Sequence, residues 1–461
     1  MHHHDASAEE LTQAVVRYAI ERVRLDPPPL DGPRTPTELR REAGRTITED
    51  GIGGTEALRI FADVLAPACI SIDHPRFLAF LPAAPTEAAV LFDLVVGASS
   101  IYGGSWLEGA GAIFAENEAL SWIAGLAGLP EGAGGVFVSG GTAGNLSALL
   151  AARWRWRHLA NGRHDRTRGL IVASTGAHSS VAQAARAMDA DVVLCPADVS
   201  GRLSGAALEQ TVAGLLAQDR DRLFAVVATA GTTNAGVVDD LAAAAAVAES
   251  TGVWFHVDGA YGAAGLAAPS VRDRFAGIDR ADSLILDPHK WLFAPFDSCA
   301  LIYRDPESGR AAHTQQAEYL DVLHPVAEPG QESGPWNASD YAHPLSRRAR
   351  GLPLWFSLAT HGSNAYTEAI ETTLRVTREG ARLIEAAPHT ELLLEPELSV
   401  LLFRRVGWEP ADYAAWSDAL LAEQVAFVTP TSWHGETVLR LCVVNPLTTA
   451  DDIALLIERL A

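Results

Sequence analysis

Short apolar runs alternate with amphipathic stretches between about residue 75 and residue 300. The apolar runs are four to seven residues long and lie at 135–139, 169–173, 191–195, 223–229, 254–258, 283–286 and 299–303. Apolar runs this short, separated by helical stretches, are typical of parallel strands that are covered by helices on both faces. The pattern predicts an α/β domain built on a mostly parallel sheet of about seven strands.

The N-terminal residues follow a helical pattern instead. Apolar positions recur with helical spacing over 6–24 and again over 53–66, and three consecutive prolines at 27–29 end the first stretch. We therefore expect residues 1–70 to form a helical arm.

The C-terminal part begins after a long polar stretch. Residues 304–344 are rich in Gly, Pro and Gln, and loops of this length are usually functional or mobile. A helix is expected from 346 towards 362, followed by three strands and two helices at 399–404, 426–430, 438–444, 412–423 and 450–460. The chain is thus predicted to contain the arm (1–70), a large α/β domain (71–345) and a small α+β domain (346–461).

Composition excludes several classes of protein. The 461 residues carry a formal net charge of −22, and no run of basic residues stands out, so nucleic-acid binding is not expected. No apolar stretch is long enough to span a membrane. The four cysteines (Cys69, Cys195, Cys299 and Cys442) are scattered without CxxC spacing, which argues against disulfides and a metal site and favours the cytoplasm. The N-terminus lacks a signal-peptide pattern, and whether residues 1–4 are native stays open.

One compositional feature points to chemistry. Lys290 is the only lysine among 35 basic residues, and the other 34 are arginines. Arginine supplies surface charge but cannot lose its proton at accessible pH, so it cannot be a nucleophilic amine. The alternative is a general arginine bias that left one lysine by chance, so the surroundings of Lys290 have to decide.

A glycine-rich turn follows the first predicted strand. The sequence Gly140-Gly141-Thr142-Ala143-Gly144-Asn145 leads into a helix. Glycines let backbone amides approach an anion, the helix N-terminus adds partial positive charge, and Thr142 offers a hydroxyl. The turn is therefore a candidate phosphate site, although many such turns only reverse the chain. It matches neither the Walker loop nor GxGxxG.

Two later strands end in polar groups. Asp258 follows a buried strand, and one crossover further on the sequence Asp287-Pro288-His289-Lys290 follows the next strand. Ligands of open α/β sheets lie at the carboxyl ends of strands, where a protonated pyridine nitrogen would pair with the acid. A simple helix-capping role for Asp258 is the alternative.

Two further polar segments are expected at the same edge. His178 follows the second strand and offers a flat imidazole that can stack on an aromatic ring, and Thr229 closes the fourth strand with a hydroxyl. A structural histidine and a polar turn are the simpler interpretations.

Taken together, these segments resemble the group II pyridoxal-phosphate amino-acid decarboxylases, which include aromatic-amino-acid, histidine and glutamate decarboxylases. The resemblance runs from about residue 74 to the C-terminus. It rests on seven segments in order, which read HPRF, SGGTAGN, HSSV, ATAGTT, HVDGAY, DPHKW and, at 346–348, SRR.

The resemblance implies an aspartate-aminotransferase-like fold (fold type I), the cofactor pyridoxal 5'-phosphate and a role for each matching residue. Lys290 is then the Schiff-base lysine, Asp258 pairs with the pyridine nitrogen and His178 stacks on the ring. The residues implied around the phosphate are Gly141, Thr142, Ala143 and His289. Ala260 is implied under the pyridine ring, and Thr229 is implied near the polar edge of the cofactor.

The family also places a tyrosine on a mobile loop, where it reaches into the partner subunit's site. Tyr319 lies 29 residues after Lys290 and is the matching candidate. The resemblance thus implies a homodimer with the active site at the subunit interface, and a tyrosine that protonates the substrate carbon after carbon dioxide leaves. Related aldehyde synthases lack this tyrosine, so Tyr319 favours simple decarboxylation, although it is open to a packing role alone.

The substrate side is less defined by sequence. Candidate substrate-facing residues are Phe80, Pro82, Tyr102, Trp106 and Ser346, whose aromatic members suggest an aromatic or bulky amino acid or, equally, core packing. The sequence departs from the family at Asp287, where animal members often have Asn, and at 350–353. The alternatives are a decarboxylation-dependent aldehyde synthase, an aminotransferase or lyase of the same fold, and an inactive scaffold homologue.

Overall fold

The large domain is built on a seven-stranded sheet. The computed structural model describes residues 5–81, 84–159, 167–324 and 335–461. The strand order is β1-β7-β6-β5-β4-β2-β3, with β1 at Gly134–Val138, β2 at Gly169–Ser174, β3 at Ala190–Cys195, β4 at Leu223–Thr229, β5 at Trp254–Asp258, β6 at Ser283–Leu286 and β7 at Cys299–Tyr303. Within this sheet β7 alone is antiparallel, so the carboxyl ends of the other six strands lie at one edge.

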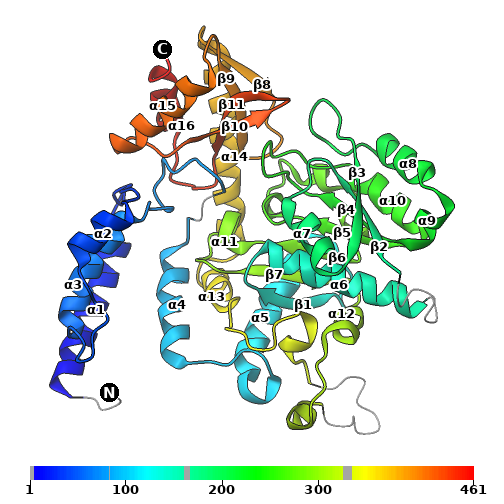
Figure 1. Ribbon diagram of the computed structural model, residues 1–461, viewed down its shortest axis with the longest axis horizontal. Coiled ribbons are helices and arrows are strands. Elements are labelled where there is room, and N and C mark those ends of the chain that lie inside the picture. The colour runs from blue at the N-terminus through cyan, green and yellow to red at the C-terminus, as the bar shows by residue number, and fades with distance from the viewer. Residues whose placement is uncertain (1–4, 82–83, 160–166, 325–334) are drawn as a thin grey trace.

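Helices cover both faces of the sheet (Figure 1). The helices of this domain are α4 (Glu87–Ser99), α5 (Trp106–Leu126), α6 (Gly141–Leu159), α7 (Ser179–Ala187), α8 (Gly205–Gly214), α9 (Ala217–Arg222), α10 (Leu241–Thr251), α11 (Pro288–Trp291) and α12 (Pro306–His313), of which α4 lies apart from the sheet. Several begin at a capping side chain, as where Asp240 accepts a hydrogen bond from the amide of Ala243 at the start of α10.

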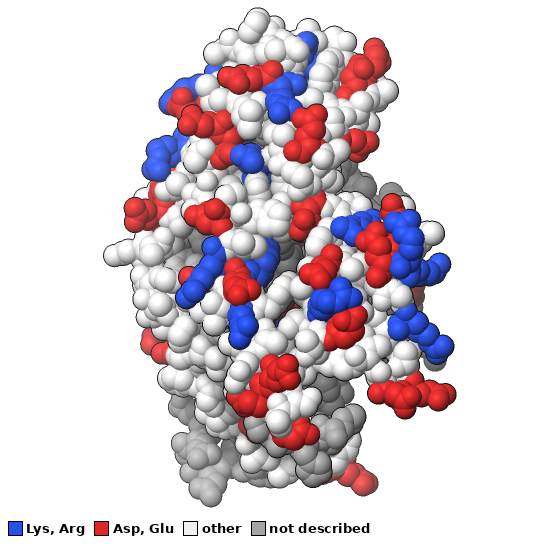
Figure 2. Space-filling view, turned by 90° about the vertical axis from the view of Figure 1, so that its left-hand side faces the viewer, with Lys and Arg blue, Asp and Glu red and all other residues white. Residues whose placement is uncertain are grey.

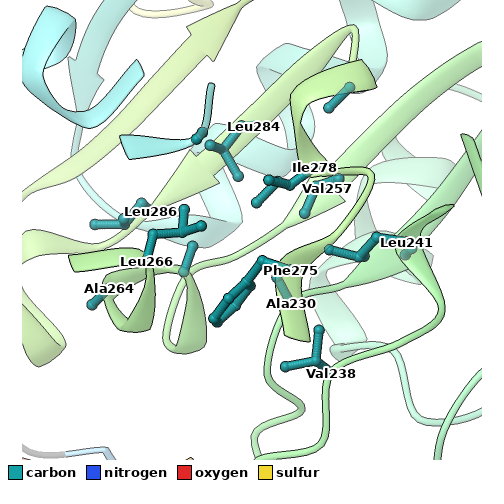
Figure 3. Close-up of a cluster of buried hydrophobic side chains, with 14 of the residues drawn as sticks. Ala230, Val238, Leu241, Val257, Ala264, Leu266, Phe275, Ile278, Leu284 and Leu286 are labelled. Carbon is teal, nitrogen blue, oxygen red and sulfur yellow. The ribbon is translucent and has the colours of Figure 1, made fainter. Parts of the chain in front are cut away.

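The core lies on both sides of the sheet because strand side chains alternate between its faces. Leu170 and Val172 of β2 join one buried cluster, whereas Ile171 and Ala173 join the other. Figure 3 shows part of the first cluster, where Val257 and Leu284 lie near Phe275 and Leu266 of the short 3-10 turns. Both faces are thus closed to water, which leaves the strand edges as the place for chemistry.

The C-terminal residues form a second, four-stranded antiparallel sheet in the order β10-β11-β9-β8. Its strands are β8 (Thr390–Leu394), β9 (Val400–Arg405), β10 (Thr429–Trp433) and β11 (Glu436–Cys442), and the helices of this part are α13 (Leu352–His361), α14 (Ser363–Ala386), α15 (Pro410–Ala422) and α16 (Ala450–Glu458). The long helix α14 packs on α16 and on the turn Gly262–Ala267 of the large domain, so it connects the two parts.

The N-terminal helices lie along one side of the molecule, drawn in blue in Figure 1. They are α1 (Ala6–Val23), α2 (Pro36–Ala43) and α3 (Gly54–Ile60). No residue of α1 is buried, and its apolar side chains Val15 and Ile20 are 41% and 38% exposed. On this side acidic and basic side chains are interspersed instead of forming a field of one sign (Figure 2). Within the described residues, no helix has the length and apolar character needed to cross a lipid bilayer.

The predicted α/β class and mostly parallel seven-stranded sheet are confirmed, and each predicted strand of that sheet agrees with the structure to within one residue at either end. Three local predictions are wrong. The polar stretch after Arg304 contains α12, and the small sheet has a fourth strand, β8, beside the unpredicted helix α14. The helix expected from residue 346 begins at Leu352, because the buried Arg347 side chain holds the preceding segment extended against α5 and β1.

Candidate active site

A cavity of about 470 Å³ opens at the edge where the parallel strands end. Nine of the residues singled out from the sequence line it: Gly141, Thr142, Ala143, His178, Thr229, Asp258, Ala260, His289 and Lys290. A larger cavity of about 960 Å³ lies between the second half of α6 and the end of α12, and none of those nine residues reaches it. The residues predicted to carry chemistry therefore meet in one place, as the sheet topology requires.

Asp258 ends β5 and is 4% exposed. Its Oδ2 accepts a hydrogen bond of 2.8 Å from Asn145 Nδ2, and its Oδ1 accepts one of 3.2 Å from the amide of Ala260. No arginine or lysine pairs with this carboxylate in the described part of the chain. A buried acid with two donors and no cation beside it is suited to bind a cationic ligand group.

Asn145 is held in turn by a buried histidine. His256 Nε2 lies 2.7 Å from Asn145 Oδ1, and His256 Nδ1 lies 2.8 Å from Ser283 Oγ. Burial lowers the pKa of His256 to about 4, so the ring is neutral at neutral pH. Because the carboxylate of Asp258 only accepts, the amide nitrogen of Asn145 faces it, and His256 Nε2 donates to the amide oxygen.

The same network orients the ring of His178. Asn145 Nδ2 also donates to Ser180 Oγ at 2.8 Å, and that hydroxyl lies 2.8 Å from His178 Nδ1. The amide of Ser180 donates to the same nitrogen at 3.2 Å. With two donors on Nδ1, the ring proton is on Nε2. His178 is thus oriented by the same asparagine that contacts Asp258.

Lys290 follows β6 on the short helix α11. Its Nζ lies 2.9 Å from Asp287 Oδ2, and 21% of its side-chain surface remains exposed. Burial opposes protonation of the amine, but the carboxylates of Asp287 and, more weakly, Asp258 outweigh it and raise the pKa of Lys290 above its ordinary value. The amine therefore carries a proton in the absence of a ligand.

The glycine turn lies beside this amine. A Cβ on Gly141 would stand 3.2 Å from Ala260 Cβ and 3.3 Å from Asp287 Oδ2, so a side chain there would crowd the cavity wall. The amides of Ala143 and Gly144 donate to the carbonyl of Gly140, so within the described residues the amides of Gly141 and Thr142, both at the cavity wall, are the ones left for a ligand. His289 Nδ1 accepts a hydrogen bond of 3.0 Å from the amide of Ser298, which leaves the proton on Nε2. These groups suit an anion such as a phosphate.

Thr229 supplies an unpartnered polar atom. Its amide donates to Asp239 Oδ2 at 2.7 Å, which fixes the end of β4. Its hydroxyl Oγ1 is buried and has no hydrogen-bond partner within the described residues. An unsatisfied buried hydroxyl is costly, so this atom is available to a polar group of a ligand in the cavity.

Five other predicted site residues (Phe80, Tyr102, Trp106, Tyr319 and Ser346) do not line the described wall of the cavity in the single chain. Tyr319 lies in the turn Glu318–Leu323 and is 72% exposed, and Phe80 is 61% exposed. Tyr102 donates its hydroxyl hydrogen to the carbonyl of Leu345, the amide of Trp106 donates to Asn337 Oδ1, and Ser346 is exposed. Pro82 lies outside the described residues.

Sequence reasoning assigned no role to several residues of the cavity wall, among them Asn145, Ser180, Asp287 and Phe296. Asn145 stands four residues after Gly141, so helical spacing alone could have placed it above the phosphate turn. Asp287 was visible as an acid at a strand end, like Asp258. Phe296 packs against His289 with ring centroids 4.6 Å apart, a contact that no local pattern announces.

The site fits pyridoxal phosphate on its donor set. It combines one amine, a buried acid without a cation, an anion-binding turn, an imidazole and an orphaned hydroxyl within one cavity. Such a set, at the carboxyl edge of a mostly parallel sheet, defines a pyridoxal-phosphate enzyme of aspartate-aminotransferase-like fold.

Comparison with known proteins is consistent with that class. Residues 48–406 match the model of the pyridoxal-dependent decarboxylase conserved domain. The chain is 30% identical over 428 residues to an aromatic-L-amino-acid decarboxylase of Bacillus atrophaeus, covering 90% of this chain and 86% of that protein. It is 31% identical over 410 residues to an L-2,4-diaminobutyrate decarboxylase of Rhizobium meliloti (strain 1021), covering 86% and 80%.

Two other relatives bear on the alternatives. A phenylacetaldehyde synthase of Arabidopsis thaliana is 27% identical over 415 residues, covering 85% of this chain and 82% of that protein. The crystal structure of Oryza sativa TDC with PLP and tryptamine superposes with a TM-score of 0.86 at 23% identity, covering 99% of this chain and 97% of that chain, and supports the fold. The chain belongs to the pyridoxal-dependent decarboxylase family. It is a pyridoxal-phosphate enzyme that decarboxylates an amino acid.

Proposed function

We propose that the enzyme converts an L-amino acid with an aromatic or otherwise bulky side chain to its amine and carbon dioxide. The observation that carries this proposal is the meeting of the sole lysine, Lys290, with Asp258 and His178 in one cavity. A chain that had lost catalysis would have no need of its only amine at that place, so an inactive scaffold is not favoured.

Each cavity residue has a role in this proposal. Bound pyridoxal phosphate supplies the electron sink for loss of carbon dioxide. Lys290 would hold the cofactor through its amine, and Asp258 would pair with the protonated ring nitrogen. His178 and Ala260 would contact the ring. The groups assigned to the phosphate and the polar edge are Gly141, Thr142, Ala143, His289 and Thr229.

The charges of the cavity favour a neutral substrate side chain over a cationic one. Three carboxylates line the described wall: Asp258 is assigned to the cofactor's ring nitrogen, Asp287 pairs with Lys290, and Asp297 pairs with Arg350 Nε at 2.8 Å. A diamino acid would need a free carboxylate for its side-chain ammonium. The exposed ring of Phe296, 51% accessible at the wall, offers an apolar surface instead.

A screen of amino acids for carbon dioxide release tests the substrate class. We expect aromatic amino acids to exceed 2,4-diaminobutyrate and glutamate, and Phe296→Ala to raise KM for the best aromatic substrate several-fold with a smaller change in kcat. If 2,4-diaminobutyrate is the best substrate, the aromatic assignment is wrong.

The role of Lys290 has its own test. Borohydride reduction of the cofactor-loaded enzyme should attach the cofactor to the single peptide that contains Lys290, as read by mass spectrometry. Lys290→Arg keeps the positive charge but has no nucleophilic amine, so it should show neither the adduct nor the visible absorbance of the lysine-bound cofactor. Attachment at any other residue would refute the assignment.

We also propose a homodimer in which Tyr319 completes the partner's site. Tyr319 is exposed and lies away from the cavity of its own chain, and apolar side chains of α4 and α5 are exposed as well, including Leu94, Val95 and Phe114. Exposed apolar patches of this kind mark protein interfaces. Phe80 and Tyr102 are proposed to complete the same composite site.

Mixed dimers test this arrangement. In a hybrid of a Lys290→Ala chain with a Tyr319→Phe chain, a tyrosine that acts in the partner's site restores one intact site, so activity should return to about half of the value for each wild-type dimer. If Tyr319 acts in its own chain, neither site is intact and the hybrid stays inactive.

The second candidate function is that of a decarboxylation-dependent aldehyde synthase. The similarity to a phenylacetaldehyde synthase supports this candidate. The presence of Tyr319 favours the amine product. Product analysis decides, because the synthase reaction consumes oxygen and releases aldehyde, ammonia and peroxide. We further propose a cytoplasmic location, which the four free cysteines of the described residues support. We also propose that the chain divides into an N-terminal arm (1–70), a large domain (71–345) and a small C-terminal domain (346–461).

A further inference from the structure

Asp287 makes a contact that the proposed roles leave unexplained. It directly follows β6, is 2% exposed, and its Oδ2 lies 2.9 Å from Lys290 Nζ and 3.6 Å from His289 Nε2. Its second oxygen, Oδ1, is buried and has no hydrogen-bond partner within the described residues. A buried carboxylate oxygen that lacks a donor is costly, so an acid at this place is expected to have a function.

The amine has to change its protonation state during the reaction. As an ammonium it is stabilised by Asp287, but an ammonium has no lone pair with which to bond to an aldehyde carbon. Lys290 must therefore lose a proton before it captures the cofactor, and again whenever it displaces an amine product. The Lys290 side chain is 21% exposed, and the Asp287 carboxylate lies 2.9 Å from Nζ, so a group in contact with the amine is placed to take that proton before it reaches bulk water.

The other titratable groups around the amine are less suited. Burial lowers the pKa of His289 despite the nearby Asp287 carboxylate, and its Nδ1 already accepts from the Ser298 amide. Burial, reinforced by Asp287, raises the pKa of the Cys299 thiol well above its ordinary value, so it is not a thiolate. Asp258 is held by Asn145, and Asp297 is held by Arg350.

We propose that Asp287 is the proton-exchange partner of Lys290. When the amine bonds to the aldehyde carbon, one proton passes from Nζ to Oδ2 and on to the aldehyde oxygen, which leaves as water with a second proton from Nζ. When Lys290 displaces an amine product, Oδ2 takes the proton from Nζ in the same way and gives it to the departing amine nitrogen. Each N–H bond that breaks is replaced by an O–H or N–H bond, so no other acid or base is needed. The inference deepens the proposed function, since it rests on Lys290 as the reacting amine.

The single lysine makes this proposal directly measurable. Lysine labelled with carbon-13 at Cε yields one signal in the full-length enzyme freed of cofactor, and its titration reports the protonation of Lys290 alone. We expect Asp287→Asn, which keeps the shape and loses the charge, to lower the titration midpoint by about 1–3 pH units. Asp297→Asn removes a carboxylate that lines the same cavity without contacting the amine and is the matched control, with a midpoint close to that of the wild type.

The rate of cofactor capture separates proton exchange from simple charge pairing. Mixing pyridoxal phosphate with the cofactor-free wild type should produce lysine-bound absorbance at a rate that is flat around neutral pH, because the proton moves within the pair. In Asp287→Asn the amine must lose its proton to water, so the rate should fall about tenfold for each pH unit below the new midpoint.

Two outcomes overturn the proposal. One is an unchanged lysine midpoint in Asp287→Asn, and the other is a lowered midpoint with a capture rate as flat as in the wild type, which would leave Asp287 as a counter-ion only. Asp287→Ser, with the same expected results, replaces the asparagine variant if the latter does not fold. Failure of borohydride labelling at Lys290 would refute the proposed function separately, because the lysine titration needs no cofactor.

Discussion

Asn145 Nδ2 donates to Asp258 Oδ2 at 2.8 Å, and this bond joins the first turn of α6 to the end of β5. The same nitrogen donates to Ser180, which orients His178. One amide on the phosphate-turn helix thus positions both the acid and the imidazole of the site.

Replacing Asn145 with Asp should weaken cofactor binding. The change removes a hydrogen bond to a charged group and places a second carboxylate against Asp258, an effect of about 1.5–3 kcal/mol or more, which is about 10- to 100-fold in Kd. Equilibrium dialysis of pyridoxal phosphate measures it. Ser180→Ala removes one hydroxyl of the same network and should cost less than about tenfold. Wild-type affinity in Asn145→Asp would contradict the role of this bond.

Replacing Tyr319 with Phe should change the product. Without the phenol as proton donor, amine formation is expected to fall about 100-fold or more, while oxygen uptake, aldehyde and peroxide appear. Chromatography of products together with an oxygen electrode measures both. Tyr18→Phe on α1, remote from the cavity, is the control. Unchanged amine output from Tyr319→Phe would assign the proton to another donor.

The Glu116–Arg347 pair should dominate local stability. Glu116 Oε2 lies 2.7 Å from Arg347 Nη1, both side chains are at most 4% exposed, and Oε1 also accepts from the amide of Gly351. Glu116→Gln leaves a buried guanidinium without its counter-ion and should cost about 3–5 kcal/mol in urea unfolding. Glu379→Gln, which breaks an exposed pair with Arg382, should cost less than about 1 kcal/mol. Equal effects would show that burial of the pair is unimportant.

His313 should make the fold sensitive to mild acid. Burial lowers the pKa of His313 to about 4, below the ordinary value near 6.5, so the unfolded chain binds more protons between these pH values. Stability is then complete above about pH 6.5 and falls as the pH drops towards 4, by about 2 kcal/mol at pH 5. His313→Gln keeps a donor for the carbonyl of Ser147, which His313 Nε2 contacts at 3.0 Å.

Urea unfolding at pH 7 and pH 5 measures this effect, and the variant should lose about 2 kcal/mol less than the wild type between the two. His158→Gln, an exposed histidine on α6, is the control and should follow the wild type. Parallel pH profiles for all three proteins would contradict the assignment.

Much of the cofactor site was predictable because the topology of a parallel sheet leaves few possible positions for the residues at its strand ends. Strands that are buried on both faces show as uninterrupted apolar runs, and their carboxyl ends must share an edge. Polar residues directly after such runs, as at Thr229, Asp258 and Lys290, are therefore expected near one another without any knowledge of distances. Sequence reasoning did not predict the segment before Leu352 correctly. The salt bridge between Arg347 and Glu116 is a tertiary contact with no local sequence signal.

The chain's residues alone determined the class of fold, the need for one reactive amine and the group of strand ends around it, since these follow from periodicity and from the chemistry of side-chain types. The tertiary structure decided which atoms touch: that Asn145 contacts Asp258, that Asp287 contacts the amine, and that Tyr319 and Phe80 lie outside the cavity of their own chain. The bond between Asn145 and Asp258 depends on a separation defined to a few tenths of an ångström between segments over a hundred residues apart, and no local pattern encodes such a distance.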